Sequence, residues 1–307
     1  MKLRLGTRGS DLAMTQSRWV ASELARSGIE TEIVVISTSG DRSTAPSFGA
    51  IGPQGVFVRE IEQALLETEI DLAVHSYKDL PTESPAGLIV AAVPPRRDMA
   101  DWLLYRHDTK RGQTPFSALP ANALVGTSSA RRQAWLKHSR PDLDLQPLRG
   151  NVPTRINRLV SGDYEAIVLA GAGIERLDEA TDLLAAPLTD LKRHRLNPEQ
   201  FVPAPAQGAL AVQSRADAKS VLEALAVLDD ESTREAVDLE RRALRLAEGG
   251  CDTAFGAWAR PADNGFDLFV MIEREGRIES AKVTGNAEAK LETEAMQRLA
   301  PANPGAI

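Results

Sequence analysis

The sequence has little that could form a metal centre or a covalent cross-link. Only one of its 307 residues is a cysteine, Cys251, and the histidines are few and scattered, at His75, His107, His138 and His194. A single cysteine excludes an internal disulfide and a cysteine cluster for a metal. No HExxH or CxxC motif is present either. We therefore expect no metal site, and any catalysis should rest on acid–base chemistry and electrostatics.

Long apolar runs and an excess of positive charge are also missing. No apolar stretch approaches the ~18–20 residues that cross a bilayer, and the opening MKLRLGTRGS alternates like a strand and lacks the apolar segment of a signal peptide. The formal net charge is −7, whereas binding to nucleic acid depends on a basic surface. We expect a cytoplasmic protein that binds neither membranes nor nucleic acid.

What the sequence does contain is an alternation of strand and helix patterns over its first two-thirds. A chain of this length is expected to form two or three domains. The expected strands fall in two sets, at 2–7, 29–37, 70–76 and 87–93, and then at 102–106, 123–129, 144–150 and 164–173, with helices at 11–28, 56–69, 130–140 and 152–162. This rhythm predicts an α/β fold with mainly parallel sheets and helices on both faces.

The last third breaks the rhythm. PAPAQGALAVQSR (203–215) should return to the first sheet, so that the chain crosses twice between two lobes and forms a hinged cleft. A charged helix at 229–250, an antiparallel pair at 266–274 and 277–285, and a final helix near 286–300 predict a small α+β domain. We expect a first lobe from 1–95 and 204–224, a second from 99–200, and a C-terminal domain from 228–307.

A chemically suggestive motif is AVHSYKDLP, residues 73–81. A predicted apolar strand ends there, and ligands of open α/β sheets sit at the carboxyl ends of strands. Asp79, beside Lys78, could act as a general acid or stabilise a cation. The alternative is that Asp79 caps a turn or helix, a position that aspartate favours. His75 by itself is more typical of packing than of catalysis.

Arginines recur where predicted strands lead into helices. GTRGS (6–10) holds Arg8 and Ser10, GTSSARRQ (126–133) holds Arg131 and Arg132, and LRGNVPTR (148–155) holds Arg149 and Arg155. Helix starts with free N–H groups bind anions, and arginine suits carboxylates and phosphates. Well-capped helices with solvated arginines are the alternative, and for Arg176 the surface interpretation is favoured. Together the motifs predict a site for a ligand with several anionic groups.

The lone cysteine lies in EGGCDTAFG, residues 248–256. Its surroundings leave two interpretations open, an inert small residue of a core or an attachment point for a ligand. The preceding glycines would let such a loop approach a ligand closely.

These motifs resemble those of a known family. GTRGSDLA, GVFVREIEQALL, DLAVHSYKDLP, VGTSSARRQ, LRGNVPTRI, PAPAQGAL and EGGC, in this order, closely resemble the porphobilinogen deaminase (hydroxymethylbilane synthase) family over residues 3 to about 275. The resemblance implies two lobes like those of periplasmic binding proteins and a C-terminal α+β domain, and a monomer. It also implies a transferase of tetrapyrrole and heme biosynthesis that joins four porphobilinogen molecules head to tail. The linear hydroxymethylbilane would pass to uroporphyrinogen III synthase.

The resemblance also assigns roles to residues. It implies a dipyrromethane cofactor joined to Cys251 by a thioether, a catalytic Asp79 assisted by Lys78, and no metal. Cofactor contacts would come from Arg8, Ser10, Ser76, Lys78, Thr127, Ser129, Arg131, Arg132, Arg149 and Gly150. Substrate contacts would come from Arg8, Phe57, Arg149, Arg155 and Arg176; Phe57 fits a core residue equally well.

The sequence departs from the family pattern in three places. Gln54 stands where many relatives have lysine, Asp252 is an acidic neighbour of Cys251, and RRDMADW (96–102) replaces the usual PRDA. Two other functions compete with the deaminase. One is a two-lobed binding protein for polycarboxylates, since the implied lobes share their fold with solute-binding proteins; the other is a degenerate homologue that no longer assembles the cofactor because of the altered loop and the altered neighbourhood of Cys251. A binding protein would need neither Asp79 nor Cys251.

Overall fold

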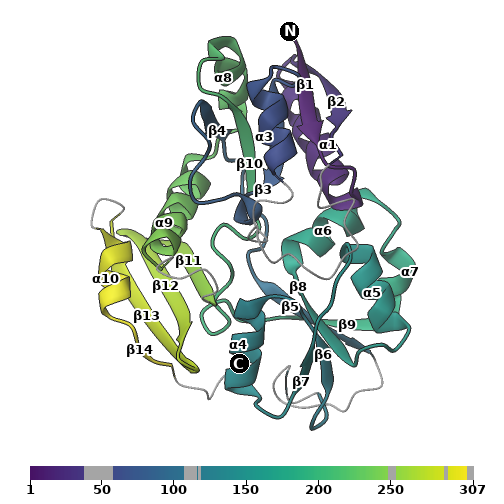
Figure 1. Cartoon of the computed structure of the whole chain (residues 1–307), viewed down its shortest axis with the longest axis vertical. Helices are drawn as coiled ribbons and strands as arrows, with labels where there is room; N and C mark the ends of the chain where they lie inside the picture. The colour runs from purple at the N-terminus through teal and green to yellow at the C-terminus, as the bar shows by residue number, and fades with distance from the viewer. Residues whose placement is uncertain (38–57, 107–115, 117–118, 248–253, 287–289, 303–307) are drawn as a thin grey trace. The chain divides into compact units, whose positions relative to one another are not determined.

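The computed structural model describes residues 1–37, 58–106, 116, 119–247, 254–286 and 290–302. The chain divides into two compact units (Figure 1). The first joins Met1–Arg97 to Ala209–Arg234, and the second joins Asp98–Gly208 to Glu235–Ile307. Each unit is therefore built from two separate stretches of sequence. The finer division into three domains stays a prediction.

The first unit is built on a mixed sheet. Its strand order is β2-β1-β3-β10-β4, in which β1 is parallel to β2 and β3, while β10 is antiparallel to both of its neighbours. The elements of this unit are β1 (Lys2–Thr7), α1 (Asp11–Arg26), β2 (Glu30–Val35), α3 (Arg59–Leu66), β3 (Leu72–Ser76), β4 (Leu88–Ala92), β10 (Leu210–Arg215), α8 (Lys219–Leu225) and the start of α9 (Glu231–Ala247).

The return of β10 to this sheet confirms the expectation for residues 203–215. The described sheet is also mainly parallel, as expected, because β2, β1, β3 and β4 run in one direction and β10 runs against them. β10 enters directly from the second unit without a helical crossover, so it can run against β3 and β4. Helices cover both faces. Leu72 and Val74 of β3 pack on α1 and α8, whereas Ala73 packs on α3, as the alternation of a strand requires.

The second unit holds another mixed sheet, of order β7-β6-β8-β5-β9. β6 is parallel to β7 and β8, and β5 is antiparallel to β8 and β9. Its elements are β5 (Asp101–Arg106), β6 (Leu124–Gly126), α4 (Ala130–Ser139), β7 (Asp144–Gln146), α5 (Val152–Val160), β8 (Ala166–Ala170), α6 (Gly171–Ala180), α7 (Ala185–Thr189) and β9 (Leu191–Arg195). The predicted strand at 164–173 was too long, because α6 begins at Gly171.

The C-terminal part of the second unit is an antiparallel sheet with two helices. The strands β11 (Phe255–Ala262), β12 (Gly265–Arg274), β13 (Arg277–Gly285) and β14 (Ala300–Pro301) follow in spatial order, and α10 (Leu291–Gln297) packs with α9 on one face. Both residues of the β12–β13 turn, Glu275 and Gly276, have positive φ. This matches the tight two-residue hairpin predicted there.

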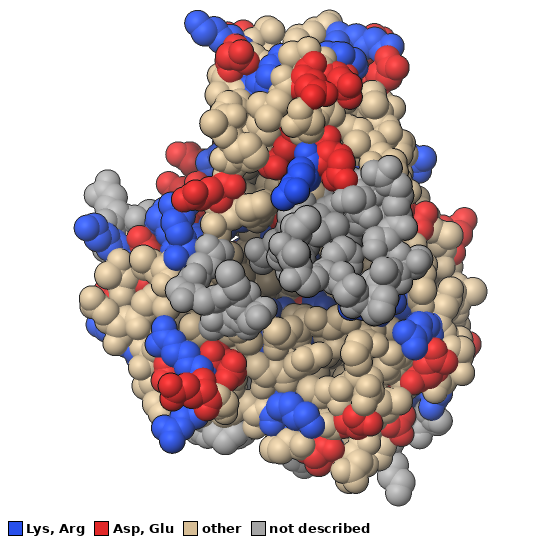
Figure 2. Space-filling model, viewed as in Figure 1, with Lys and Arg blue, Asp and Glu red and all other residues tan. Residues whose placement is uncertain are grey.

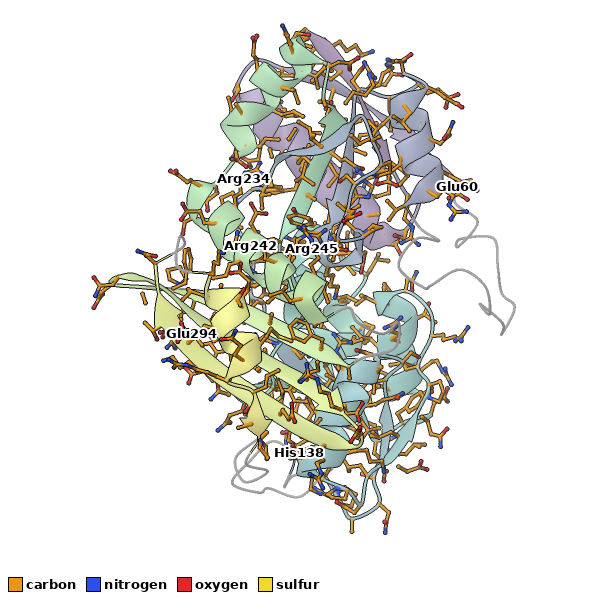
Figure 3. The ribbon with its side chains drawn as sticks, turned by 60° about the vertical axis from the view of Figure 1, so that its left-hand side comes forward. Glu60, His138, Arg234, Arg242, Arg245 and Glu294 are labelled. Atoms are coloured by element: carbon orange, nitrogen blue, oxygen red, sulfur yellow. The ribbon has the colours of Figure 1, made fainter. Side chains whose placement is uncertain are left out.

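Charged side chains of both signs are interspersed on the described surface seen in Figure 2. The helix α9 carries several of the arginines (Figure 3). Arg234 pairs with Asp229 near the start of the helix. Arg242 and Arg245 lie one turn apart further along, and Arg242 approaches Glu292 of α10. These contacts tie α9 to its neighbours, and no ligand is needed to explain them.

Candidate functional site

A pocket opens in the first unit at the carboxyl ends of β1 and β3. These strands are parallel neighbours, so the residues that follow them meet at one edge of the sheet, where ligands of α/β folds bind. The pocket is lined by Arg8, Ser10, Leu12, Ala13, Gln16, Val58, Ile61, Val74, His75, Ser76 and Asp79. Four of the residues predicted from the sequence, Arg8, Ser10, Ser76 and Asp79, are thus brought together.

A short 3-10 turn, Tyr77–Asp79, presents the predicted catalytic carboxylate. Tyr77 is buried, and its N–H donates to the carbonyl of Ala209 at 3.1 Å. Leu80 is also buried, and its N–H donates to the Tyr77 carbonyl. Asp79 is exposed between these two anchors. The N-cap position of the turn belongs to Ser76, so capping does not account for Asp79.

The first helix contributes its N-terminus to the same pocket. Ser10 occupies the N-cap position of α1 but makes no side-chain capping bond. The free N–H groups of a helix start attract anions, so α1 and Arg8 together favour a carboxylate in the pocket. Sequence reasoning missed Gln16, which is buried in α1 and donates from Nε2 to Ser76 Oγ at 2.9 Å. A polar residue within the buried stripe of a helix was the available signal.

His75 lines the pocket but is almost fully buried. It is 6% exposed, and burial lowers its pKa to about 4; an interaction with Gln213 opposes this shift and the charge of Arg8 adds to it. The imidazole beside the pocket is therefore neutral at physiological pH. His75 is therefore a packing residue, as expected from the sequence, and it also lines the pocket.

In the second unit, three helices begin at one edge of the sheet. The parallel strands β7, β6 and β8 lead into α5, α4 and α6. Ser129 is the N-cap of α4, and Asn151 caps α5 by accepting from the Thr154 N–H at 2.9 Å. Ser128 joins two of these turns, since its Oγ donates to the Leu148 carbonyl and accepts from the Leu148 N–H. The edge is a rigid array of helix starts.

Arg131 and Arg132 are held inside this unit. Both are buried and share the fully buried carboxylate of Asp101, each at 2.7 Å. Arg131 also donates to the carbonyl of Val202, and Arg132 to that of Val168. Burial alone would raise the pKa of Asp101, but the two guanidiniums outweigh it and lower that pKa. Much of the hydrogen-bonding capacity of these two arginines is thus committed to the protein, which sequence reasoning did not foresee.

The other predicted arginines lie nearer the surface of the same edge. Arg149 is exposed, and Gly150 after it has φ +107°, a conformation that favours glycine. Arg155 donates from Nε to the Gly150 carbonyl at 2.7 Å. Arg176 of α6 donates to the Gly208 carbonyl at 2.8 Å. Thr127 is buried at the end of β6.

Several predicted features lie outside the described residues. These are the cofactor cysteine Cys251, its neighbour Asp252, the substrate residue Phe57 and Gln54. Within the part of the chain that the structure describes, no group of three histidine, cysteine, aspartate or glutamate side chains could hold a metal ion. None of the helices in that part is both long and apolar enough to cross a membrane.

The geometry can bind anions and move protons. The first unit offers a pocket with a carboxylate, a guanidinium and a helix start. The second offers three helix starts and several arginines. Donors of this kind suit carboxylates in either unit, and a carboxylate such as that of Asp79 can exchange a proton with a bound group.

Comparison with known proteins identifies the family. Residues 3–223 match the family model described as porphobilinogen deaminase, dipyromethane cofactor binding domain. The porphobilinogen deaminase of Mycobacterium leprae is 43% identical over 279 residues, which cover 90% of this chain and 80% of that protein. The porphobilinogen deaminase of Lysinibacillus sphaericus is 41% identical over 260 residues, covering 84% and 80%.

An ancestral cationic amino acid solute binding protein gives a TM-score of 0.42 at 13% identity, over 80% of this chain and 90% of that one. The family model spans well over half of the chain, and the curated relatives extend the match to most of it. The chain belongs to the porphobilinogen deaminase family.

Proposed function

We propose that the chain is a transferase that condenses four porphobilinogen molecules into linear hydroxymethylbilane. In each condensation the aminomethyl C–N bond of one pyrrole breaks and ammonia leaves. A C–C bond then forms to the free α-carbon of the next pyrrole, which loses its proton. Water finally releases the product. Family membership carries this proposal, and the pocket that holds Asp79 with Arg8 supports it.

Asp79 is the proposed acid and base. Loss of ammonia turns the aminomethyl pyrrole into a cation. A carboxyl group can protonate the leaving amine, stabilise that cation, and accept the α-proton of the attacking pyrrole. Asp79 is exposed on an anchored turn at the pocket, which suits a group that must reach the substrate. Lys78, next to it on the same turn, is proposed to assist.

The donor set fits the dipyrromethane cofactor of the family. The cofactor carries acetate and propionate groups and supplies the primer from which the chain grows. Arginines and helix starts are suitable partners for those carboxylates. We assign cofactor contacts to Arg8, Ser10, Ser76, Lys78, Thr127, Ser129, Arg131, Arg132, Arg149 and Gly150, substrate contacts to Arg8, Phe57, Arg149, Arg155 and Arg176, and the thioether to Cys251.

Arg131 and Arg132 require a narrower role within this assignment. Because both already bind Asp101, a carboxylate of the cofactor would add a partner to an existing ion-pair cluster. A second anion beside two guanidiniums is balanced in charge, since two positive groups then face two negative ones. The exposed Arg149 is better suited to a ligand that changes as the chain grows.

The intact mass of the purified chain beside that of Cys251→Ala tests the function. An excess equal to two deaminated porphobilinogen units in the wild type alone, together with turnover of porphobilinogen, is expected. A wild type that stays unmodified after incubation with porphobilinogen would favour the degenerate homologue. Binding of polycarboxylates without any turnover would favour the binding protein.

Three finer features complete the proposal. We propose a cytoplasmic monomer whose product is passed to uroporphyrinogen III synthase, as the family resemblance implies. Light scattering at working concentration should give the mass of one chain, 33.2 kDa plus cofactor. A dimer would contradict the monomer without affecting the proposed reaction.

A further inference from the structure

Three polar side chains form a row beneath the pocket, on the face of the first sheet that α3 covers. His75 of β3 and Gln213 of β10 belong to the antiparallel pair in which His75 faces Ala211 and Gln213 faces Ala73. They are therefore diagonal neighbours on one face, close enough for long side chains to meet. Gln213 donates from Nε2 to Oε1 of Glu62 on α3 at 3.0 Å. All three residues are buried.

Two atoms in this row have unused hydrogen-bonding capacity. Nε2 of His75 and Oε1 of Gln213 are fully buried and form no hydrogen bond of standard geometry within the described residues. The two side chains are diagonal neighbours on one face of the sheet, and Gln213 also opposes the lowering of the pKa of His75. A buried polar atom left unpaired is costly and rare in native proteins. A hydrogen bond between the two atoms would satisfy both.

The direction of that hydrogen bond follows from which atom of Gln213 lacks a partner. One N–H of the Gln213 amide donates to the Glu62 carboxylate, and the buried atom left without a partner is the amide oxygen, which can only accept. His75 must then carry its proton on Nε2. A neutral imidazole with a proton on one nitrogen has a lone pair on the other.

We propose that Glu62 and Gln213 hold His75 as its Nε2–H tautomer, so that Nδ1 accepts a hydrogen bond in the pocket. His75 lines the pocket together with Arg8 and Asp79, and its Nε2 is buried. An acceptor there suits the N–H of a pyrrole ring. This specificity role rests on the proposed function. Ser76, the next residue of β3, accepts a hydrogen bond from Gln16 on the opposite face of the sheet. Side chains on both faces therefore hold the end of β3 in place.

The tautomer can be measured without turnover. In the full chain labelled with 15N-histidine, long-range 15N–1H correlation spectra distinguish a protonated from an unprotonated ring nitrogen. The signals of His75 are those lost in His75→Asn. We expect protonated Nε2 and unprotonated Nδ1 in the wild type. A proton on Nδ1 would overturn the proposal, whether or not any variant folds.

Two glutamine variants test whether Gln213 determines the tautomer of His75. Gln213→Met keeps the volume and removes both hydrogen bonds, and should change the tautomer signals of His75. Gln63→Met, at an exposed position of the same helix that carries Glu62, should leave them unchanged. Unchanged signals in a folded Gln213→Met protein would contradict the fixing role of Gln213.

Steady-state kinetics tests the substrate contact. His75→Leu removes the acceptor, whereas His75→Asn keeps one near the position of Nδ1. Losing a neutral hydrogen bond should raise KM for porphobilinogen by up to about tenfold, with a smaller effect on kcat and with partial recovery in His75→Asn. Equal KM in both variants and the wild type would overturn the contact. A wild type without turnover would instead contradict the proposed function, and the spectra would still decide the tautomer.

Discussion

At the scale of the residue, the pocket of the first unit depends on one carboxylate held on a short turn. Replacing Asp79 with asparagine keeps the shape of the side chain but removes the carboxyl group that can donate and accept a proton. General acid–base groups contribute roughly 10²- to 10⁴-fold to rates, so we expect turnover of porphobilinogen to fall at least a hundredfold. The free energy of unfolding should hardly change, because Asp79 is exposed.

The matched control for this change is Asp11→Asn. Asp11 is an exposed aspartate in the first turn of α1, close in sequence to Ser10, but it does not line the pocket. Product formation should stay near the wild-type rate in that variant. Near-normal turnover in Asp79→Asn would remove Asp79 from the mechanism.

His75 also makes stability depend on pH. Its folded-state pKa is about 4, lowered mainly by burial, whereas an unfolded histidine titrates near 6.5. Below about pH 6.5 His75 binds a proton in the unfolded chain, whereas in the folded chain it binds one only below about pH 4. Stability from His75 is therefore full above that window and is lost across it, by about 2 kcal/mol at about pH 5.

Urea unfolding at about pH 7.5 and about pH 5 measures this loss. The wild type should lose more stability than His75→Asn over the interval. His138 and His194, whose pKa values burial also lowers, are present in both proteins and cancel in the difference. Equal losses would show that the pKa of His75 is not lowered in the folded state.

At the scale of the element, the second unit orders its anion-facing edge through helix caps. Asn151 caps α5 directly after Arg149 and Gly150. Replacing an N-cap asparagine with alanine costs about 1 kcal/mol. We expect Asn151→Ala to lower the free energy of unfolding by that amount and to raise KM for porphobilinogen, because the turn that carries Arg149 loosens.

Asn157→Ala is the matched change on the same helix. Asn157 is exposed in the interior of α5, where alanine is the better helix former, so stability should stay the same or rise slightly. Urea unfolding and initial rates of both variants distinguish the loss of the N-cap from the general effect of replacing asparagine with alanine. Equal effects of the two substitutions would contradict a capping role.

The sequence predicted most elements but not their environment. Motifs at strand ends located Asp79, Arg8 and the helix starts, because turn and cap residues act locally. Asp101 could not be found in this way. It lies within a strand, and its role depends on two arginines that are distant in sequence. Gln213 and Glu62 likewise meet across 151 positions, which no local pattern encodes.

At the scale of the whole molecule, the second crossing of the chain completes the first unit. β10 lies between β3 and β4, and it is the strand to which β4 pairs in the described sheet. Val212 of β10 is fully buried in the same cluster as Leu72 and Val74. Residues 1–97 alone would leave β3 and β4 with open edges and exposed apolar surface, which favours aggregation.

We therefore expect residues 1–97 alone to lack a cooperative fold, and residues 1–97 joined through a flexible glycine–serine linker to 209–234 to regain one. Circular dichroism during urea unfolding and resistance to a protease measure this. The control is the same linked chain with Val212→Asp, which buries a charge in the centre of the sheet and should abolish the gain. Cooperative unfolding of residues 1–97 alone would show that the first stretch is an independent domain and that β10 only extends it. Recovery that depends on an intact β10 would show instead that the first unit needs both of its stretches, so its pocket should form only after residues beyond 208 have been synthesised.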